Sequence, residues 1–277
     1  MGLQIMTNEL AIAAQRNLEG TNRRLNSTLQ KLASGSRIVQ ASDDPAGLAI
    51  SDQMNATIRS LGQAVRNSQD GMSLIQIYEG GSNEINNMLL RMRELCMQSA
   101  TDTVGELERS MLNDEVQQMK EEIERVARTT KFSGQELLSG AEIQMEFQVG
   151  VNNDPDVDRI RFAPGDSNLT PSALGVDGVD VTDKTAAQDA LESLDHAINS
   201  VNRIRARVGS AQNRLYTTIS SQQIYQENLM AARSRIRDAD LAQESANLAR
   251  ETILRKAGVA VLAQANETPA LALQLLR

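Results

Sequence analysis

The C-terminal stretch of the chain, residues 231–277, restricts the fold more than any other segment. Val259-Ala-Val-Leu-Ala263 would place apolar side chains on every side of a helix, and Leu271-Ala-Leu-Gln-Leu-Leu276 continues the run. A helix on the surface of a monomer has one apolar stripe, whereas a helix that is apolar all round needs cover on every side. The free end of a chain seldom finds such cover within its own domain. We therefore expect other copies of the chain to provide it.

The N-terminal stretch has the pattern of a helix that pairs with this segment. From about Leu3 to Leu32, apolar side chains recur at three- and four-residue spacing, with basic side chains between them. That spacing is typical of a coiled-coil seam. Both ends are therefore expected to be helices that pack within and between subunits. The residues expected in subunit packing are Leu3, Met6, Leu10, Val259, Val261, Leu262, Leu273 and Leu276.

The composition of the chain indicates long helices rather than a compact globule. Among 277 residues there is no Trp, and Tyr and Phe occur three times each. Large aromatic side chains usually dominate a compact core, and here they are scarce. Ala, Leu, Gln, Glu and Arg, which favour helices, are frequent instead. We predict a mainly α fold, an elongated antiparallel helical bundle or coiled coil.

The middle of the chain continues the helical pattern. Ser42-Asp-Asp-Pro45 is typical of a helix start, because any of the three polar residues can cap the helix and proline fits its first turn. A second seam runs from Leu61 to Cys96, and Gly80-Gly81 predicts a bend within it. After a polar stretch at residues 99–105, apolar residues from Leu112 to Val126 repeat in a heptad. The chain is therefore expected to reverse direction there.

A change of period predicts a β-hairpin. Apolar and polar residues alternate from Ile143 to Val149 and again from Arg159 to Phe162, with turn-rich residues 150–156 between them. Helical spacing returns at Ala187. We expect a small β-hairpin region within about residues 140–185, at the end of the bundle distal to the termini.

The sequence offers no set of residues for catalysis or for a metal or cofactor. Neighbouring carboxylates such as Asp114-Glu115 point in different directions on a helix and form no acid–base pair. His196 is the single histidine, and Cys96, the single cysteine, is expected to be a buried apolar residue. No phosphate-binding loop or zinc spacing occurs. We therefore predict no enzyme activity, no catalytic residue, no metal and no cofactor.

Charge and hydropathy argue against two further classes of partner. The acidic excess behind the net charge of −8 lies in the middle of the chain, the ends are close to neutral, and no basic patch for nucleic acid stands out. No run of 18 apolar residues predicts a membrane span. Met1 to Leu10 lacks the basic start of a cleavable signal peptide, so export would use another route. We expect neither nucleic acid nor a membrane as a partner.

Four motifs carry a resemblance to a known family. The segment Leu32–Ser51, which ends in Ala-Ser-Asp-Asp-Pro-Ala-Gly-Leu-Ala-Ile-Ser, resembles the N-terminal signature of bacterial flagellins. The C-terminal signature of the family is similar to Arg237–Ser245 and to Lys256–Asn266, which contains Ala-Gly-Val-Ala-Val-Leu-Ala-Gln-Ala-Asn. The ending Leu275-Leu-Arg277 is similar as well. Both signatures occur in the expected order.

The resemblance, which covers residues 1–140 and 187–277, implies a structural subunit that polymerises into the bacterial flagellar filament for swimming motility. In that family the terminal helices, here residues 1–42 and 236–277, form an inner-core coiled coil, and the rod, here residues 43–235, forms the outer core. The resemblance implies secretion in an unfolded state, by the flagellar type III export apparatus, to the extracellular filament. Implied partners are further copies, sister flagellins, an export chaperone, and the filament cap and junction proteins.

The resemblance also implies a surface for the innate immune flagellin receptor. In the family this surface lies on the helix that matches Leu89–Gln98 and includes a glutamate of the next helix. The matching residues here are Arg91, Leu95 and Glu115. Leu90 stands where receptor-activating members usually have glutamine, which removes a hydrogen-bonding side chain. The same residues are also expected to pack against a neighbouring subunit, and the two roles do not exclude each other.

Two other functions stay open at this point. A hook–filament junction protein of the flagellum would share related terminal helices, although the full run Ala257–Asn266 favours the filament subunit. A cytosolic coiled-coil adaptor, or an enzyme on a helical scaffold, would share the helical pattern alone. Because only about 45 residues separate Gly140 from Ala187, no extra variable outer domain is expected.

Overall fold

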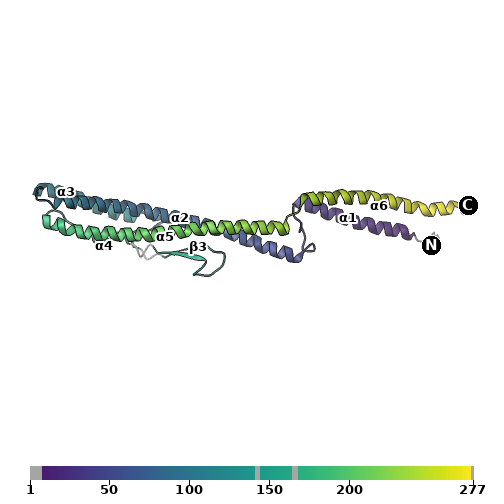
Figure 1. The fold of residues 1–277 in the computed structure, drawn as a ribbon, viewed down its shortest axis with the longest axis horizontal. Coiled ribbons are helices and arrows are strands. Elements are labelled where there is room, and N and C mark those ends of the chain that lie inside the picture. The colour runs from purple at the N-terminus through teal and green to yellow at the C-terminus, as the bar shows by residue number, and fades with distance from the viewer. Residues whose placement is uncertain (1–7, 141–143, 164–167, 276–277) are drawn as a thin grey trace. The chain divides into compact units, whose positions relative to one another are not determined.

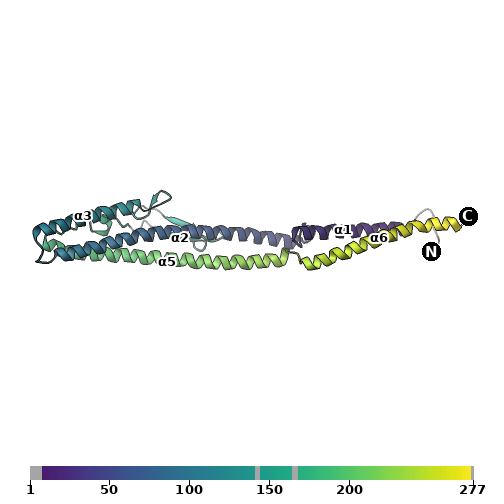
Figure 2. The same cartoon turned by 90° about the horizontal axis from the view of Figure 1, so that it is seen from above.

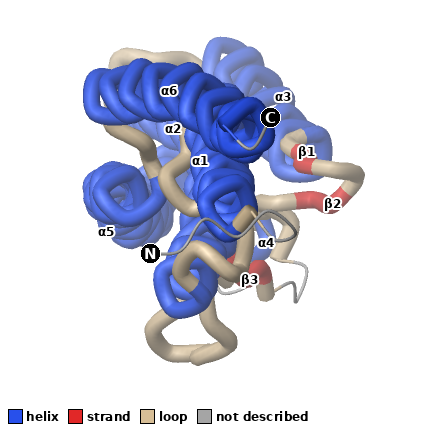
Figure 3. Tube along the Cα trace, turned by 90° about the vertical axis from the view of Figure 1, so that its right-hand side faces the viewer, coloured by secondary structure: helices blue, strands red, loops and turns tan. Residues whose placement is uncertain are grey.

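The computed structural model describes residues 8–140, 144–163 and 168–275, and of residues 268–275 it describes only the helix. The elements fall into two units. The terminal unit contains the residues up to Ile58 and those from Glu227 onward, and the central unit contains Arg59–Gln226. Most described residues are helical, and the strands are confined to short segments (Figure 3). The prediction of a mainly α fold with a small antiparallel hairpin is confirmed.

The terminal unit is built on two helices, α1 (Glu9–Ser34) and α6 (Leu241–Leu275), which lie side by side (Figures 1 and 2). Asn8 caps α1, because its side-chain oxygen accepts from the Ala11 N–H at 3.1 Å. The amide nitrogen of the same side chain donates to the Ala265 carbonyl at 2.6 Å. One side chain therefore starts α1 and ties it to α6.

Backbone hydrogen bonds close the other end of this helix pair. Gly35 follows α1 with a φ of 66°, a left-handed conformation that favours glycine. The Arg37 N–H donates to the Arg237 carbonyl at 2.6 Å, and the Ala239 N–H donates to the Gly35 carbonyl at 2.9 Å. Backbone N–H and carbonyl groups that have no partner within their own helix therefore form hydrogen bonds with each other at this end.

The next helix, α2 (Pro45–Ser99), begins as the sequence predicts. Asp44 caps it, because its Oδ1 accepts a hydrogen bond from the Gly47 N–H at 2.9 Å. Pro45 has no N–H, which costs nothing in the first turn of a helix. Asp43 holds the preceding loop instead. Hydrogen bonds from the N–H groups of Gln40 and Val39 lower the pKa of Asp43. The two neighbouring carboxylates thus have different structural tasks.

The central unit contains three long helices. The second half of α2 lies alongside α3 (Glu106–Thr129) and α5 (Lys184–Arg237), as Figures 1 and 2 show, while α4 (Pro171–Leu174) is a single turn. The chain reversal and the returning helix that the sequence predicts are both found. The core between these elements is mostly aliphatic. Fully buried side chains include Leu74, Ile75, Tyr78, Ile85, Leu89, Met92, Leu95, Ile123, Leu137, Leu138 and Leu169.

The predicted β-hairpin is present in the central unit. Strand β3 (Met145–Gln148) pairs antiparallel with β4 (Arg159–Phe162), and Met145 lies opposite Phe162. Ile143, where the predicted strand begins, lies outside the described residues. A second pair, β1 (Lys131–Phe132) with β2 (Gln135–Glu136), is not predicted from the sequence. Its strands are too short to produce an alternating pattern.

The β3–β4 hairpin lies at a different place along the bundle from the one expected. The Asn67 side chain donates to the Gln148 carbonyl at 3.1 Å, and a Cβ on Gly71 would lie 3.0 Å from the Phe147 ring. Both helix positions come long before α2 ends at Ser99, and the end of the bundle is instead formed by the α2–α3 connection. Gly71 leaves room for an aromatic ring on the face of α2, and this recess positions the hairpin.

Helix α2 contains two adjacent glycines, and one of them is needed for close packing. The sequence predicts a bend at Gly80-Gly81, yet α2 continues through both residues as a single helix. A Cβ on Gly81 would lie 2.7 Å from Leu138 Cδ1 and 2.8 Å from Thr130 Oγ1, whereas a Cβ on Gly80 would meet nothing within 4 Å. Leu138 is fully buried, and a close-packed core gives it little room to move aside. Gly81 is therefore required for close approach, and Gly80 is not.

Alanine substitution should separate the roles of these adjacent glycines. We expect Gly81→Ala to lower the free energy of unfolding by about 1–3 kcal/mol, because the new methyl group overpacks the core. Gly80→Ala, the matched control, should raise it by about 0.4–1 kcal/mol, because the site has room and alanine restricts the unfolded chain. Chemical denaturation followed by circular dichroism measures both changes. Equal effects of the two substitutions would contradict the packing role of Gly81.

Candidate assembly and receptor surfaces

The helix pair of the terminal unit buries one seam and leaves many apolar side chains uncovered. The buried residues of this seam are Ala14, Thr21, Leu25, Thr28 and Ala265. Large apolar side chains are exposed on the same two helices at Leu10, Ile12, Leu29, Leu241, Ile253, Leu254, Val259 and Val261. Exposed apolar surface of this extent marks an interaction site. The pair of helices is therefore incomplete without further cover.

Three of the predicted packing residues belong to this exposed surface. Leu10 is 67% exposed, Val259 is 53% exposed and Val261 is 58% exposed, while Leu262 is half-buried. The structure thus places all four on the paired helices of the terminal unit. The other predicted residues lie outside the described side chains, namely Leu3, Met6, Leu273 and Leu276.

The exposed surface also includes residues that the sequence analysis missed. Leu254 precedes Val261 by seven residues, which places both on one face of α6. Ile253 and Ile12 are exposed as well. The heptad spacing of Leu254 and Val261 is a signal that could have identified the first of these residues.

An ion pair links the two terminal helices at their seam. Arg24 Nε donates to Glu251 Oε1 at 3.0 Å, and the Glu251 side chain is only 12% exposed. The other carboxylate oxygen, Oε2, is buried and has no hydrogen-bond partner among the described residues. A carboxylate in this situation depends on its single cation, because an unpaired buried charge is costly. The pair therefore helps to fix how α1 and α6 align.

The residues expected in the receptor surface are divided between surface and core. Arg91 on α2 pairs with Glu115 on α3 at 3.0 Å and with Glu94 at 3.1 Å, and half of its side chain is exposed. The hydrogen bonds to Glu94 and Glu115 raise the pKa of Arg91, which therefore stays charged. Leu95 is 1% exposed and belongs to the core. The structure thus brings Arg91 and Glu115 together at the surface and places Leu95 inside.

The two helices that carry this ion pair also expose apolar side chains. Leu90 and Met97 are exposed on α2, and Leu107 and Met111 are exposed on α3. The last two lie outside the heptad Leu112–Val126 on which the prediction for this helix depends, and the sequence analysis did not single them out. These two helices therefore expose apolar side chains in addition to charged ones.

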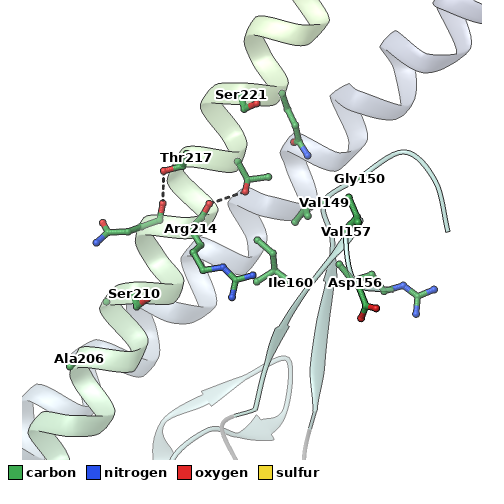
Figure 4. Close-up of a pocket in the computed structure, with 15 residues that line it drawn as sticks. Val149, Gly150, Asp156, Val157, Ile160, Ala206, Ser210, Arg214, Thr217 and Ser221 are labelled. Atoms are coloured by element: carbon green, nitrogen blue, oxygen red, sulfur yellow. Dashed lines mark hydrogen bonds between the residues drawn. The ribbon is translucent and has the colours of Figure 1, made fainter. Parts of the chain in front are cut away.

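A groove of about 970 Å³ runs between α5 and the β3–β4 hairpin. Its α5 side carries mostly short side chains. Figure 4 shows Arg214 reaching from α5 toward Ile160 of the hairpin. The labelled residues on α5 are Ala206, Ser210, Arg214, Thr217 and Ser221, and those on the hairpin include Val149, Val157 and Ile160. Gln222 also lines the groove, and its buried Oε1 has no partner among the described residues. Short side chains along one face allow another helix to approach closely.

The described residues contain no cluster of three or more His, Cys, Asp or Glu side chains that could hold a metal ion. His196 is exposed on α5 and lies 3.8 Å from Glu192. Cys96 is buried, and burial raises its pKa to about 11, so its thiol stays protonated near neutral pH. Among the helices in the described ranges, none is both long enough and apolar enough to cross a membrane.

A mainly helical chain whose paired ends present uncovered apolar surface is a structural subunit of a larger assembly. The sequence matches the bacterial flagellin N-terminal helical region over residues 5–142 and the bacterial flagellin C-terminal helical region over residues 191–276. The chain therefore belongs to the bacterial flagellin family.

Relatives of the chain match it over nearly their whole length. It is 45% identical over 267 residues to a flagellin of Halalkalibacterium halodurans, which covers 96% of this chain and 97% of that protein. It is 38% identical to the flagellar filament 33 kDa core protein of Treponema phagedenis, with 98% of each chain covered. It is 36% identical to a flagellin of Bacillus subtilis, with 99% of this chain and 100% of that protein covered.

Solved structures agree with this assignment. The crystal structure of Bacillus cereus flagellin is similar with a TM-score of 0.50 and 30% identity, over 57% of this chain and 88% of that one. A putative flagellar hook-associated protein from Vibrio parahaemolyticus has a TM-score of 0.58 over 71% of this chain and 100% of that one. At 14% identity, the second likeness concerns the fold alone.

Family membership decides between the functions that the sequence left open. The chain is a structural subunit that polymerises with copies of itself into the extracellular filament of the bacterial flagellum, and it is not an enzyme. The full-length relatives are named flagellin or flagellar filament core protein, so a hook–filament junction protein is not favoured.

Loss of the cation at the terminal seam should loosen the pairing of α1 with α6. We expect Arg24→Gln to lower the opening free energy of α6 in the free chain by about 1 kcal/mol, because the buried carboxylate of Glu251 loses its charged partner. Amide hydrogen exchange of α6 measures this change. Arg23→Gln is the matched control, since Arg23 is exposed and forms no ion pair within the described residues. Identical exchange in the two variants would show that the ion pair has no role in alignment.

Proposed function

We propose that the chain joins the flagellar filament through its terminal unit. The exposed apolar side chains of α1 and α6 pack against the same helices of neighbouring copies. The observation that carries this proposal is the exposure of Leu10, Val259 and Val261 on helices that are already paired. In this arrangement residues 1–42 and 236–277 form the inner core of the filament, and residues 43–235 form the outer core.

The energy of such contacts supports a cooperative interface. Burying one Val, Leu or Ile side chain contributes about 1.5–3 kcal/mol relative to leaving it in water. Association of two proteins costs about 4–15 kcal/mol in lost freedom of motion, so one or two side chains cannot support a polymer. The set of large apolar side chains exposed on α1 and α6 meets this requirement, because many of them are buried in one step.

The route to the filament involves partners that handle the chain before it assembles. We infer that an export chaperone covers the apolar C-terminal helix, and that the chain passes unfolded through the flagellar type III export apparatus. The filament cap receives new copies at the growing tip, and junction proteins contact the first copies at the base. Sister flagellins with similar ends join the same polymer. The uncovered apolar surface of α6 supports the need for a chaperone.

A second proposed role concerns the free chain outside the filament. We infer that the innate immune flagellin receptor contacts the surface around Arg91 and Glu115, which are paired and partly exposed. Leu95 acts from the core, where it holds α2 in place, rather than by touching the receptor. Leu90 is exposed beside Arg91 in the sequence and offers the receptor no hydrogen bond.

A glutamine at position 90 should strengthen receptor binding. We expect Leu90→Gln to raise the affinity of the free chain for the receptor ectodomain by about 2–10-fold, because one new hydrogen bond contributes about 0.5–1.5 kcal/mol. Surface plasmon resonance measures this change. Met97→Gln makes the same apolar-to-amide exchange at another exposed position of α2 and should have no effect. A gain from Met97→Gln alone, or no gain from either, would contradict the proposed surface.

Polar substitution on α6 should block assembly without unfolding the chain. We expect Val259→Ser combined with Val261→Ser to slow filament growth from native seeds by about tenfold or more, because two contacts with neighbouring copies are lost. The free energy of unfolding should change by less than about 0.5 kcal/mol, since both side chains are exposed in the free chain. Light scattering and denaturation measure the two quantities. Growth at the native rate would contradict assembly through this surface, and Lys256→Gln is the control on the same helix.

A further inference from the structure

A groove of about 390 Å³ lies between α1 and α6 in the terminal unit. Gly20 borders it on α1, and Gly258 borders it on α6. A Cβ on Gly20 would meet only one side-chain atom within 4 Å, Nη1 of Arg24. The apolar part of the lining includes Ala14, Leu18, Leu254, Ala257 and Val261. A concave and mostly apolar site of this kind can receive an apolar side chain.

The charged part of the groove is basic. Arg16 and Arg24 line it and are exposed. Arg24 is already paired with Glu251, whereas Arg16 forms no ion pair with any described residue. Among the described residues that line the groove, none is Asp or Glu. An apolar side chain with acidic neighbours would therefore complement the groove in both respects.

The opposite side of the same helix pair carries two exposed leucines. Leu29 on α1 is 45% exposed, and Leu241 on α6 is 58% exposed. Leu29 is nine residues from Gly20 and Leu241 is sixteen residues from Ala257. These spacings correspond to about 180° and about 160° around the two helices. Both leucines therefore point away from the groove of their own chain.

We infer that Leu241 of one copy enters the groove between α1 and α6 of a second copy, and that the two copies point in the same direction. Sixteen residues correspond to about 24 Å along a helix, so the second copy is displaced by this distance along the helix pair. The same displacement brings Leu29 level with Ala14, fifteen residues before it on α1, at the far end of the groove.

The inference rests on the proposed assembly through the terminal unit and names one contact within it. The leucines and the groove lie on opposite sides of one helix pair. Each copy therefore provides Leu241 to one neighbour and receives Leu241 from another. A contact of this head-to-tail kind is not completed by two copies, and it continues into an open helical filament when its rotation does not close a ring. Copies joined in this way all keep the same direction.

The charges around Leu241 distinguish it from other exposed apolar side chains. Asp238 and Asp240 precede it, are exposed, and form no ion pair with another described residue. In the displaced arrangement Asp240 is level with Gly258, and these acids approach Arg16 on the neighbouring copy. Ile253 is 66% exposed, but Arg255 and Lys256 follow it and would bring like charge to the arginines of the groove.

Single cysteines in separate chains test the contact. Leu241→Cys and Ala257→Cys each add one exposed thiol, while the native Cys96 is buried. The two variants are mixed in equal amounts, grown from native seeds and oxidised. Covalent dimers should form in the mixed filaments and in neither variant alone, because a disulfide requires Cβ atoms within about 4.5 Å. Denaturing gel electrophoresis measures the dimers.

A matched control uses Val259→Cys in place of Ala257→Cys. Val259 lies two residues further on, which turns it by about 200° around α6 and away from the groove. This mixture should give no dimers. Filaments without dimers in the first mixture, or with equal dimers in both mixtures, overturn the inference and leave assembly through the terminal unit intact. Failure of that assembly would appear instead as native growth of the Val259→Ser and Val261→Ser variant.

Growth rates test the same contact without cysteines. Leu241→Ser should slow seeded growth about tenfold or more, and Leu241→Met, which keeps an apolar side chain, should stay within about threefold of the native rate. Because Leu241 is exposed in the free chain, circular dichroism should give the same thermal midpoint for both variants. Native growth of Leu241→Ser also overturns the inference.

Discussion

When two helices lie side by side, each covers only one face of the other and leaves the remaining faces exposed. The function of this chain depends on the apolar faces that stay exposed. In the terminal unit α1 and α6 share a seam that Leu25 and Ala265 occupy, and residues such as Leu10 and Val261 remain in contact with water. A third or fourth helix would be needed to cover them. Among its described residues this unit has no further long helix apart from the ends of α2 and α5, so additional copies are the natural source of cover.

In the central unit, glycines on α2 make room for the large side chains that pack against this helix. Aromatic side chains are scarce, but two of them meet in this core: the Tyr78 and Phe162 rings contact each other edge to face, with centroids 5.5 Å apart. The Phe147 ring sits against Gly71, and Leu138 sits against Gly81. Glycine at these points lets the hairpin segment and the loop after α3 lie directly on α2. The core of the central unit is therefore covered by residues of the same chain.

The helices could be predicted from the sequence because their apolar residues are periodic. The place along α2 where the hairpin packs could not be predicted in this way. Alternation from Met145 onward indicates a strand, but it does not tell which part of α2 will receive it, and the recess at Gly71 becomes visible only in the structure. Leu95 shows the reverse case. Its spacing of three residues from Met92 places it in the buried seam, yet the family resemblance placed it on the receptor surface.

The uncovered apolar surface and the acidic charge lie in different parts of the chain. Apolar contacts between terminal units are strong but not directional, and the near-neutral charge of the ends leaves little repulsion to oppose them. Repulsion between exposed charges of the acidic middle acts only over a Debye length of about 8 Å at physiological salt, so it matters where copies touch.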